Sequence, residues 1–161
     1  MQNFTDPRGI RNNNPGNIRL SKVVWQGQAA TAAQTDPDFI VFTAPVYGLR
    51  ALMKTLLTYH LKYGLDTVRS VINRWAPPVE NDTGSYMQDV ARRIGVKVDD
   101  QIDLCAQKTL VALSQAIVCH ENGRPPQGRV AHWYDPSVYA AAAALVLPLK
   151  AASVSPQKED A

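Results

Sequence analysis

The sequence predicts a mainly α-helical, single-domain protein, and three observations carry that prediction. The chain has 161 residues, 45% of them hydrophobic, which is enough for one domain with its own core. Apolar residues recur at helical spacing in segments separated by Gly, Pro or Asp. Only residues 38–44, DFIVFTA, have the apolar, β-branched character of a short strand or hairpin. We therefore predict one domain over residues 1–150 and a tail, 151–161, whose composition is typical of disorder.

Local signals place the first half of the helices. Residues 1–36 are rich in Gly, Pro, Asn, Gln and Thr without a sustained period, which predicts a structured loop with at most one helical turn. Pro45 opens a helix at its first position, where the missing N–H matters little, and Gly64 closes it. Asp66 is expected to cap a short helix that ends at residues 75–78, WAPP.

The second half of the chain predicts three further helices. Ser85 and Gln88 form a capping-box pattern for a helix that Gly95 stops. The longest periodic stretch, residues 103–121, predicts a buried central helix. A last, Ala-rich helix is expected to start at Asp135-Pro136 and to reach about residue 147.

The balance of charge narrows the class of partner. The formal net charge is +3, and 19% of the residues are charged, without a run of Lys or Arg. A mild positive balance suits an acidic partner such as the anionic polymers of a bacterial wall, whereas nucleic acid usually requires a denser basic patch. The longest apolar run, residues 139–149, is too short to span a bilayer. We therefore expect no nucleic-acid partner and no stable membrane insertion.

The two cysteines and the first residues indicate where the chain is made. If one helix carries Cys105 and Cys119, they stand roughly 21 Å apart, too far for a disulfide. They are predicted to be reduced thiols of a protein made in the cytosol. The start of the sequence, MQNFTDPRG, has no signal-peptide pattern. Action outside the cytosol would require another machinery to carry or release the protein.

The candidate catalytic residue is Glu121, in the last turn of the long predicted helix. A helix C-terminus repels a carboxylate, and this repulsion, with an apolar helix face nearby, favours the protonated form. A proton-donating Glu is what cleavage of a glycosidic bond requires. The competing interpretation is an ordinary solvated glutamate at a helix end.

The segment WAPPVENDTGSY, residues 75–86, supplies further polar candidates. Glu80 and Asp82 are either site acids or ordinary loop and capping acids. Tyr86 opens the next predicted helix and faces either the core or a cleft. We predict that Glu80 and Tyr86 line the cleft that contains Glu121.

The sequence contains no motif for a metal or a nucleotide. His60, His120 and His132 lack the spacing of zinc ligands, and two cysteines on one helix do not make a zinc knuckle. No P-loop, dinucleotide fingerprint or G-x-S-x-G elbow is present. We therefore expect no metal and no organic cofactor.

An asparagine-rich loop, RGIRNNNPGNIR at residues 8–19, is the second candidate site. Asn tolerates turn conformations and bonds nearby backbone, so a loop that satisfies itself is one interpretation. The functional interpretation is recognition by amides, because an Asn side chain offers two donors and two acceptor lone pairs to an N-acetyl group or a sugar hydroxyl. We predict that Asn13, Asn14 and Asn17 contact sugar or position Glu121.

Four motifs in order resemble a family of phage and prophage proteins, many of which carry only a virion or structural-protein label. The motifs are RGIRNNNPGNIR, FxxFxxPxYGLRAL, WAPPxENDTxxY and AIxxHENG, and the resemblance covers roughly residues 8–125.

A looser resemblance links the chain to glycan cleavers of the lysozyme superfamily, including lytic transglycosylases and flagellar-type glucosaminidases. In these enzymes a helix ends in the catalytic Glu, commonly as AxxESG, and an NNxxGI-like loop and a cleft tyrosine follow. AIVCHENG resembles the helix end and carries the role to Glu121, NNPGNI at residues 13–18 resembles the loop, and Tyr86 resembles the tyrosine. Here the loop precedes the Glu helix, so the resemblance implies a circularly permuted lysozyme-like fold with residues 124–147 as an added helix. Such a permutation is physically feasible because chain termini often lie close together at the surface.

The resemblance implies cleavage of peptidoglycan glycan strands at MurNAc–GlcNAc linkages. Glu121 would be the general acid and base of a lytic transglycosylase or of a lysozyme-type muramidase or glucosaminidase. A hydrolase usually has a second carboxylate, which Glu80 or Asp82 would supply, whereas a transglycosylase acts with one Glu. The sequence leaves the two reactions open.

The competing function is a non-enzymatic virion or cell-wall-binding structural protein on the same fold, because a fold does not determine a function. An active cleaver should clear a suspension of sacculi, whereas a binding module should only co-sediment with it. In either case we expect a monomer made in the bacterial cytoplasm that meets the periplasmic wall after release, virion delivery or secretion. Whether it is an endolysin, a virion-associated enzyme or an injected effector stays open.

Overall fold

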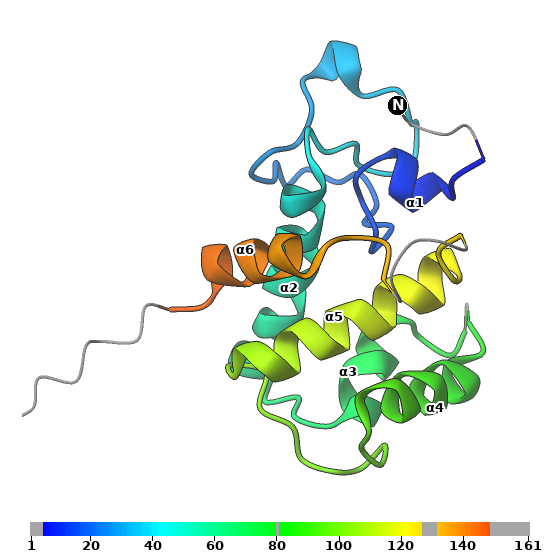
Figure 1. The fold of residues 1–161 in the computed structure, drawn as a ribbon, viewed down its shortest axis with the longest axis vertical. Coiled ribbons are helices and arrows are strands. Elements are labelled where there is room, and N and C mark those ends of the chain that lie inside the picture. Colours follow the sequence, from blue (N-terminus) through cyan, green and yellow to red (C-terminus); the bar gives the residue numbers. More distant parts are fainter. Residues whose placement is uncertain (1–4, 80, 127–131, 149–161) are drawn as a thin grey trace, which may run out of the picture.

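The protein is mainly helical, as the sequence predicts (Figure 1). The computed structural model describes residues 5–79, 81–126 and 132–148, and within these ranges it contains no β-strand. Residues 38–44 form isolated antiparallel bridges, Arg19 with Phe39 and Gln28 with Phe42, in place of a strand or hairpin. The elements in order are α1 (Arg8–Arg11), the 3-10 turn η1 (Thr31–Ala33), α2 (Pro45–Tyr63), α3 (Val68–Trp75), α4 (Thr83–Ile94), α5 (Gln107–Asn122) and α6 (Pro136–Val146).

The helices pack around one apolar core. Helix α6 crosses α2, α5 packs on α4, and α3 lies between α2 and α4 (Figure 1). The core includes the fully buried side chains Leu52, Leu56, Ile72, Leu113 and Ile117, contributed by α2, α3 and α5. Burial of apolar surface, at roughly 25 cal/mol per Å², is therefore the main force that holds these helices together.

Helix α5 is buried as predicted, but it starts later than the sequence pattern suggests. It begins at Gln107, because the Asp103 Oδ1 atom accepts a hydrogen bond from the Cys105 N–H and turns the chain before the helix. With 16 residues it is also shorter than α2, which has 19. Cys105 consequently lies outside the helix that carries Cys119, and both thiols are free.

The start and stop signals are partly confirmed. Pro45 opens α2 and Gly64 ends it in the left-handed conformation at φ 66°. Helix α3 is capped by Thr67 rather than Asp66, since the Thr67 and Ser70 side chains cap each other's N–H groups in a capping box. Helix α4 is capped by Asp82, so the predicted Ser85–Gln88 box is wrong: Ser85 already lies in the first turn.

Helix α6 begins after Asp135 as predicted, with the Asp135 side chain accepting from the Ser137 N–H. The predicted tail, 151–161, lies outside the described residues, and so does Glu80. No helix in the described part of the chain is both long and apolar enough to cross a membrane.

Residues 5–44 form an irregular region at one end of the helical body (Figure 1). Its own apolar cluster is small and consists of Ile40, Phe42 and Ala51 of α2. Apart from the short helix α1 and the turn η1, side-chain hydrogen bonds rather than regular secondary structure hold this region together. The Asp36 carboxylate, for example, accepts from Arg8 at 2.5 and 2.6 Å and from Asn12 at 2.8 Å.

Candidate active site

Three side chains hold Glu121 from three separate elements. Its half-buried side chain sits in the last turn of α5, and Oε1 accepts hydrogen bonds from the Tyr86 hydroxyl at 2.9 Å and from Trp75 Nε1 at 3.4 Å. Asn17 Nδ2 donates to Oε2 at 3.3 Å from a position 104 residues away in the chain. Both carboxylate oxygens therefore have fixed directions, as an acid–base group requires.

Tyr86 supports Glu121 from inside the protein. Its side chain is 3% exposed, and its hydroxyl also accepts from Trp75 Nε1 at 3.1 Å. Burial, together with the charge of Glu121, raises the pKa of Tyr86 far above its usual range, so the phenol stays protonated and acts as a donor. Its ring stacks on His120 with the centroids 3.7 Å apart, and His120 Nδ1 lies 3.0 Å from an oxygen of Asp89.

The asparagine loop is locked against the end of α5. Asn13 and Asn17 both adopt the left-handed conformation, with φ of 52° and 49°, which Asn tolerates better than most residues. The buried Asn122 side chain at the end of α5 donates to the Pro15 carbonyl at 2.8 Å. A Cβ atom on Gly48 would lie only 1.8 Å from the Asn13 carbonyl oxygen, so α2 and the loop touch without a side chain between them.

Glu121 opens onto a groove of about 480 Å³. The residues that line it with Glu121 include two groups that could contact a ligand. Amide or cationic groups come from Asn17, Asn81 and Arg19, and aromatic rings from Trp25, Phe39, Tyr59 and Trp75. This size and mixture are typical of a site for a small polar ligand with flat apolar faces.

The structure brings only some of the predicted site residues together. Glu121, Tyr86 and Asn17 meet, as described. Asn14 is fully buried and bonds the backbone of Ile18 and Ile40, and Asn13 donates to the Phe42 carbonyl at 3.0 Å. These two amides hold the loop in place rather than face the groove.

Of the two predicted second carboxylates, Asp82 does not join Glu121, and Glu80 lies outside the described residues. Asp82 is exposed at the start of α4, and its two oxygens accept from the Ser85 N–H at 3.2 Å and the Ser85 hydroxyl at 2.8 Å. Among the described residues that line the groove, Glu121 is the one acid.

Several groove residues were not predicted. Trp75 is the first residue of the WAPP motif. This motif lies just before the candidate acids Glu80 and Asp82, so its position was a usable signal. Arg19 ends the asparagine-rich motif of residues 8–19, which was also a usable signal. Trp25 and Tyr59 carry no such signal, because each lies in a different segment and only the fold brings them to the groove.

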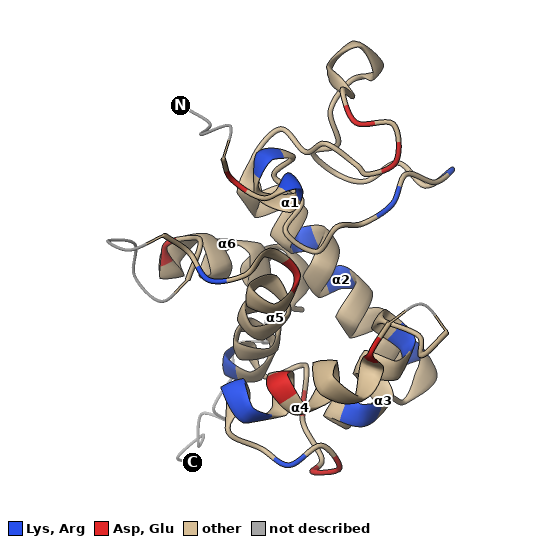
Figure 2. Ribbon diagram, turned by 90° about the vertical axis from the view of Figure 1, so that its right-hand side faces the viewer, with Lys and Arg blue, Asp and Glu red and all other residues tan. Residues whose placement is uncertain are grey.

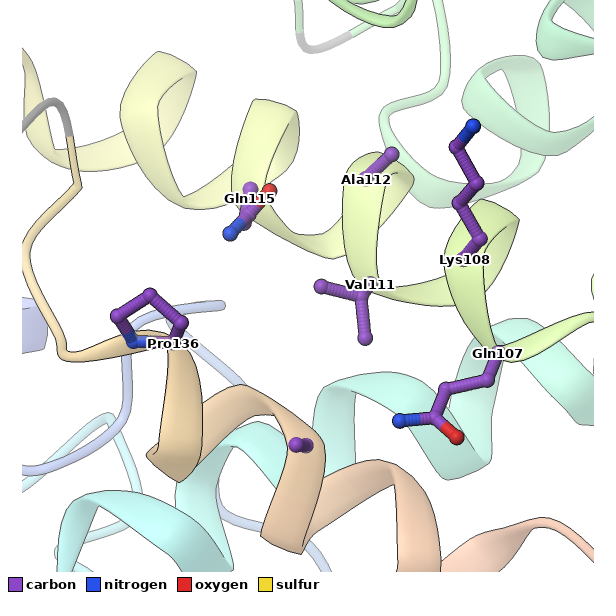
Figure 3. Close-up of a pocket in the computed structure, with 7 residues that line it drawn as sticks. Gln107, Lys108, Val111, Ala112, Gln115 and Pro136 are labelled. Atoms are coloured by element: carbon purple, nitrogen blue, oxygen red, sulfur yellow. The ribbon is translucent and has the colours of Figure 1, made fainter.

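A second recess, of about 590 Å³, lies between α5 and α6 (Figure 3). Its lining includes Val111, Ala112, Pro136 and Lys108, and no Asp or Glu is among the described residues that line it. In the described part of the chain, the ribbon positions of Lys and Arg are spread over several elements (Figure 2). The groove at Glu121 is therefore the better candidate for chemistry.

Fold and site thus define a mainly helical protein with one carboxylate held in a polar and aromatic groove. Comparison with models of known protein families gives no match. The chain is 38% identical over 122 residues to "Protein P5" of Pseudoalteromonas phage PM2, a match that covers 74% of this chain and 73% of the relative. The chain belongs to the family of that phage protein. This confirms the phage part of the resemblance drawn from the motifs.

Proposed function

We propose that the groove cleaves the glycan strands of peptidoglycan between MurNAc and GlcNAc, with Glu121 as the acid–base residue. One observation carries the proposal: Glu121, at the end of a buried helix, is held on one side by Tyr86 and on the other by Asn17 of the asparagine loop. That is the pairing of catalytic helix and loop on which the resemblance to the glycan cleavers rests. The aromatic rings of the groove suit the apolar faces of sugar rings, and its amides suit their N-acetyl groups.

In the proposed reaction, Glu121 protonates the glycosidic oxygen and the leaving sugar departs, which leaves an oxocarbenium-like centre. Tyr86 and Asn17 keep the carboxyl aimed at that oxygen. Glu121, now ionised, then removes a proton from the group that attacks this centre. Because Glu121 is the one acid among the described lining residues, attack by the 6-hydroxyl of the same sugar in a lytic transglycosylase is favoured over a two-carboxylate hydrolysis.

We further propose that the fold is a circularly permuted lysozyme-like domain. Its support is the contact between Asn122 at the end of α5 and Pro15 in the asparagine loop, 107 residues apart in sequence. In an unpermuted glycan cleaver the loop follows the catalytic helix directly. A chain cut between those two segments, with the old ends joined, would leave them neighbours in space, as they are here.

The test is mass spectrometry of purified sacculi digested with the protein and with its Glu121→Gln variant. Gln keeps shape and hydrogen bonding but has no transferable proton, so we expect a loss of about 10²–10⁴ in rate. Asp82→Asn, an exposed helix cap, is the matched control and should retain activity. Anhydro-MurNAc ends identify a transglycosylase, and reducing MurNAc or GlcNAc ends identify a muramidase or a glucosaminidase. Full activity in Glu121→Gln would refute the role of Glu121 as the acid–base residue. Co-sedimentation of the wild type with sacculi without any product would refute the proposal in favour of a non-enzymatic wall-binding protein.

A further inference from the structure

A cluster of three different donor types lies at the other end of α5, away from Glu121. His60 comes from the last turn of α2, and Asp103 and Cys105 come from the turn that precedes α5. One donor atom from each, a ring nitrogen, a carboxylate oxygen and a sulfur, lie within 4.8 Å of one another. At ~1.5 Å per residue, the length of α5 places this cluster roughly 20 Å from Glu121.

The hydrogen bonds of His60 direct a lone pair into the cluster. His60 Nδ1 lies 3.1 Å from the Leu65 carbonyl oxygen, which only accepts, so Nδ1 carries the proton. In the neutral ring Nε2 is then unprotonated, and it faces Asp103 Oδ1 at 3.6 Å. Nε2 and Asp103 Oδ1 thus direct lone pairs towards the same space, where a cation would be stabilised. A backbone carbonyl on Nδ1 is also the usual support of a histidine that binds metal through Nε2.

The turn that holds Asp103 and Cys105 is anchored before any ion arrives. The Ile102 N–H donates to the Asp66 carbonyl at 2.7 Å, and Gln101 Nε2 donates to the Asp66 carboxylate at 3.0 Å. Asp103 Oδ1 accepts the Cys105 N–H at 2.9 Å, which folds the cysteine back towards the carboxylate. The donors are therefore already close together in a fixed turn, which lowers the entropy lost when they gather around an ion.

We propose that His60, Asp103 and Cys105 bind a divalent transition metal of the zinc type. Nitrogen, oxygen and thiolate donors together are the ligand set of Zn²⁺, and the 3.6 Å between Nε2 and Oδ1 is close to the ~3.3–3.8 Å edge of a tetrahedron with bonds of ~2.0–2.3 Å. The Cys105 thiol releases its proton to solvent as the metal–sulfur bond forms. A recess of about 380 Å³, lined by His60, Gln101, Ile102 and Asp103, leaves room for water as the fourth ligand.

The site is accessible to ions from solution. Cys105 is exposed, the Asp103 side chain is 69% exposed, and that of His60 is 19% exposed. A bound metal would fasten the end of α2 to the turn before α5 and would stabilise the folded state, because the unfolded chain does not hold the three donors together. Sequence spacing did not reveal this site, since His60 lies 43 positions before Asp103.

The test is a titration of reduced, tag-free protein with Zn²⁺ against a competing chelating dye, and with Co²⁺ followed by absorbance. We expect one equivalent of Zn²⁺, a thiolate-to-cobalt charge-transfer band, and a rise in melting temperature with Zn²⁺. Cys105→Ser should abolish the band and weaken Zn²⁺ binding by more than the ~10–100-fold that loss of a supporting partner causes. Asp103→Asn should also weaken binding, although its oxygen still accepts the Cys105 N–H.

Cys119→Ser is the matched control, because Cys119 is buried in α5 outside the cluster and should leave binding unchanged. Equal Zn²⁺ affinity in wild type and Cys105→Ser would overturn the proposal. Absence of binding to the folded wild type would do the same. Lytic activity plays no part in these measurements.

Discussion

Residues 5–44 and the helical body from residue 45 onward are stabilised by different forces. The helices bury a large cluster of Leu, Ile, Val and Met side chains. The N-terminal region has only a small apolar cluster. Asn, Asp and Gln side chains bond much of its backbone, and Arg8 pairs with the Asp36 side chain. Polar side chains that would add little to stability on a helix surface are therefore structural in this region, where α1 and η1 are the helical elements among the described residues.

Glu121 lies where the two regions meet. The helical body contributes Tyr86 and Trp75 to one carboxylate oxygen, and the N-terminal region contributes Asn17 to the other. The proposed activity therefore depends on the alignment of both regions, and substitutions can separate their contributions.

Replacing Asn14 tests whether its hydrogen bonds or its packed side-chain volume stabilises the N-terminal region. Asn14→Ala leaves the Ile18 N–H and the Ile40 carbonyl without the side-chain amide, at ~1–3 kcal/mol for each buried group, so we expect a loss on the order of 3 kcal/mol in unfolding free energy. Asn14→Leu, which restores the volume, should be equally destabilised in urea denaturation. A mild effect of the Leu variant would show that packing dominates here as well.

Gly48→Ala should drive the two regions apart. The added Cβ would meet the Asn13 carbonyl oxygen at 1.8 Å, and backbone cannot easily give way, so we expect a loss of about 1–3 kcal/mol in stability. Gly84→Ala is the matched control in α4, because the added Cβ would lie 3.9 Å from its nearest neighbour, Asp82 Oδ1. That variant should be neutral or gain up to about 1 kcal/mol in thermal unfolding. Equal effects of the two substitutions would contradict the close contact between α2 and the loop.

Tyr86→Phe isolates the contribution of the helical body to Glu121. It keeps the ring on His120 but removes the hydroxyl donor, and a hydrogen bond to a charged group is worth ~1.5–3 kcal/mol, so glycan cleavage should slow by roughly 10–100-fold. Tyr139→Phe is the control: Tyr139 is fully buried, and its hydroxyl has no hydrogen-bond partner among the described residues. Activity should survive in that variant. Loss of activity in both would indicate a general packing effect.

Asn17→Gly isolates the contribution of the loop. Gly accepts the left-handed conformation at φ 49°, so the backbone stays in place while the amide that reaches Glu121 is lost. Because the bond is long, at 3.3 Å, we expect a smaller loss of activity than in Tyr86→Phe, with the melting temperature little changed. An unaffected cleavage rate would mean that the loop amide does not position the carboxyl.

Low pH should lower the stability of the N-terminal region, because the Asp36 carboxylate becomes protonated. The Arg8 guanidinium holds the pKa of the Asp36 carboxyl well below its usual range, so the folded state binds this proton less readily than the unfolded chain. The stabilisation is present above about pH 4, the ordinary pKa of an aspartate, and is lost progressively as the pH falls further. Asp36→Asn removes this titration, so the difference in unfolding free energy between wild type and variant should shrink below pH 4 in urea melts. A constant difference would exclude the ion pair.

Local chemistry predicted most of the helices and little of the irregular region. Pro45, Gly64, Gly95 and Asp135 act within their own turns, so they could be assigned from sequence alone. The caps of α3 and α4 are Thr67 and Asp82 rather than the predicted Asp66 and Ser85. Neighbouring polar residues can bond the same N–H groups, and the backbone conformation decides which of them does so. The short strand expected near residues 38–44 became isolated bridges, because side chains such as Asn14 satisfy that backbone instead.

Sequence patterns alone were enough to predict the mainly helical fold class, the position of Glu121 at a helix end and the concentration of amides in one loop. Only the fold decided which amide does what: Asn14 bonds the backbone within the N-terminal region, whereas Asn17 donates to the Glu121 carboxylate. Only the fold, likewise, brought His60 to Asp103 and Cys105. The physical reason is range: helix periodicity and capping act over a few residues, whereas the groove and the donor cluster join segments that packing alone brings together.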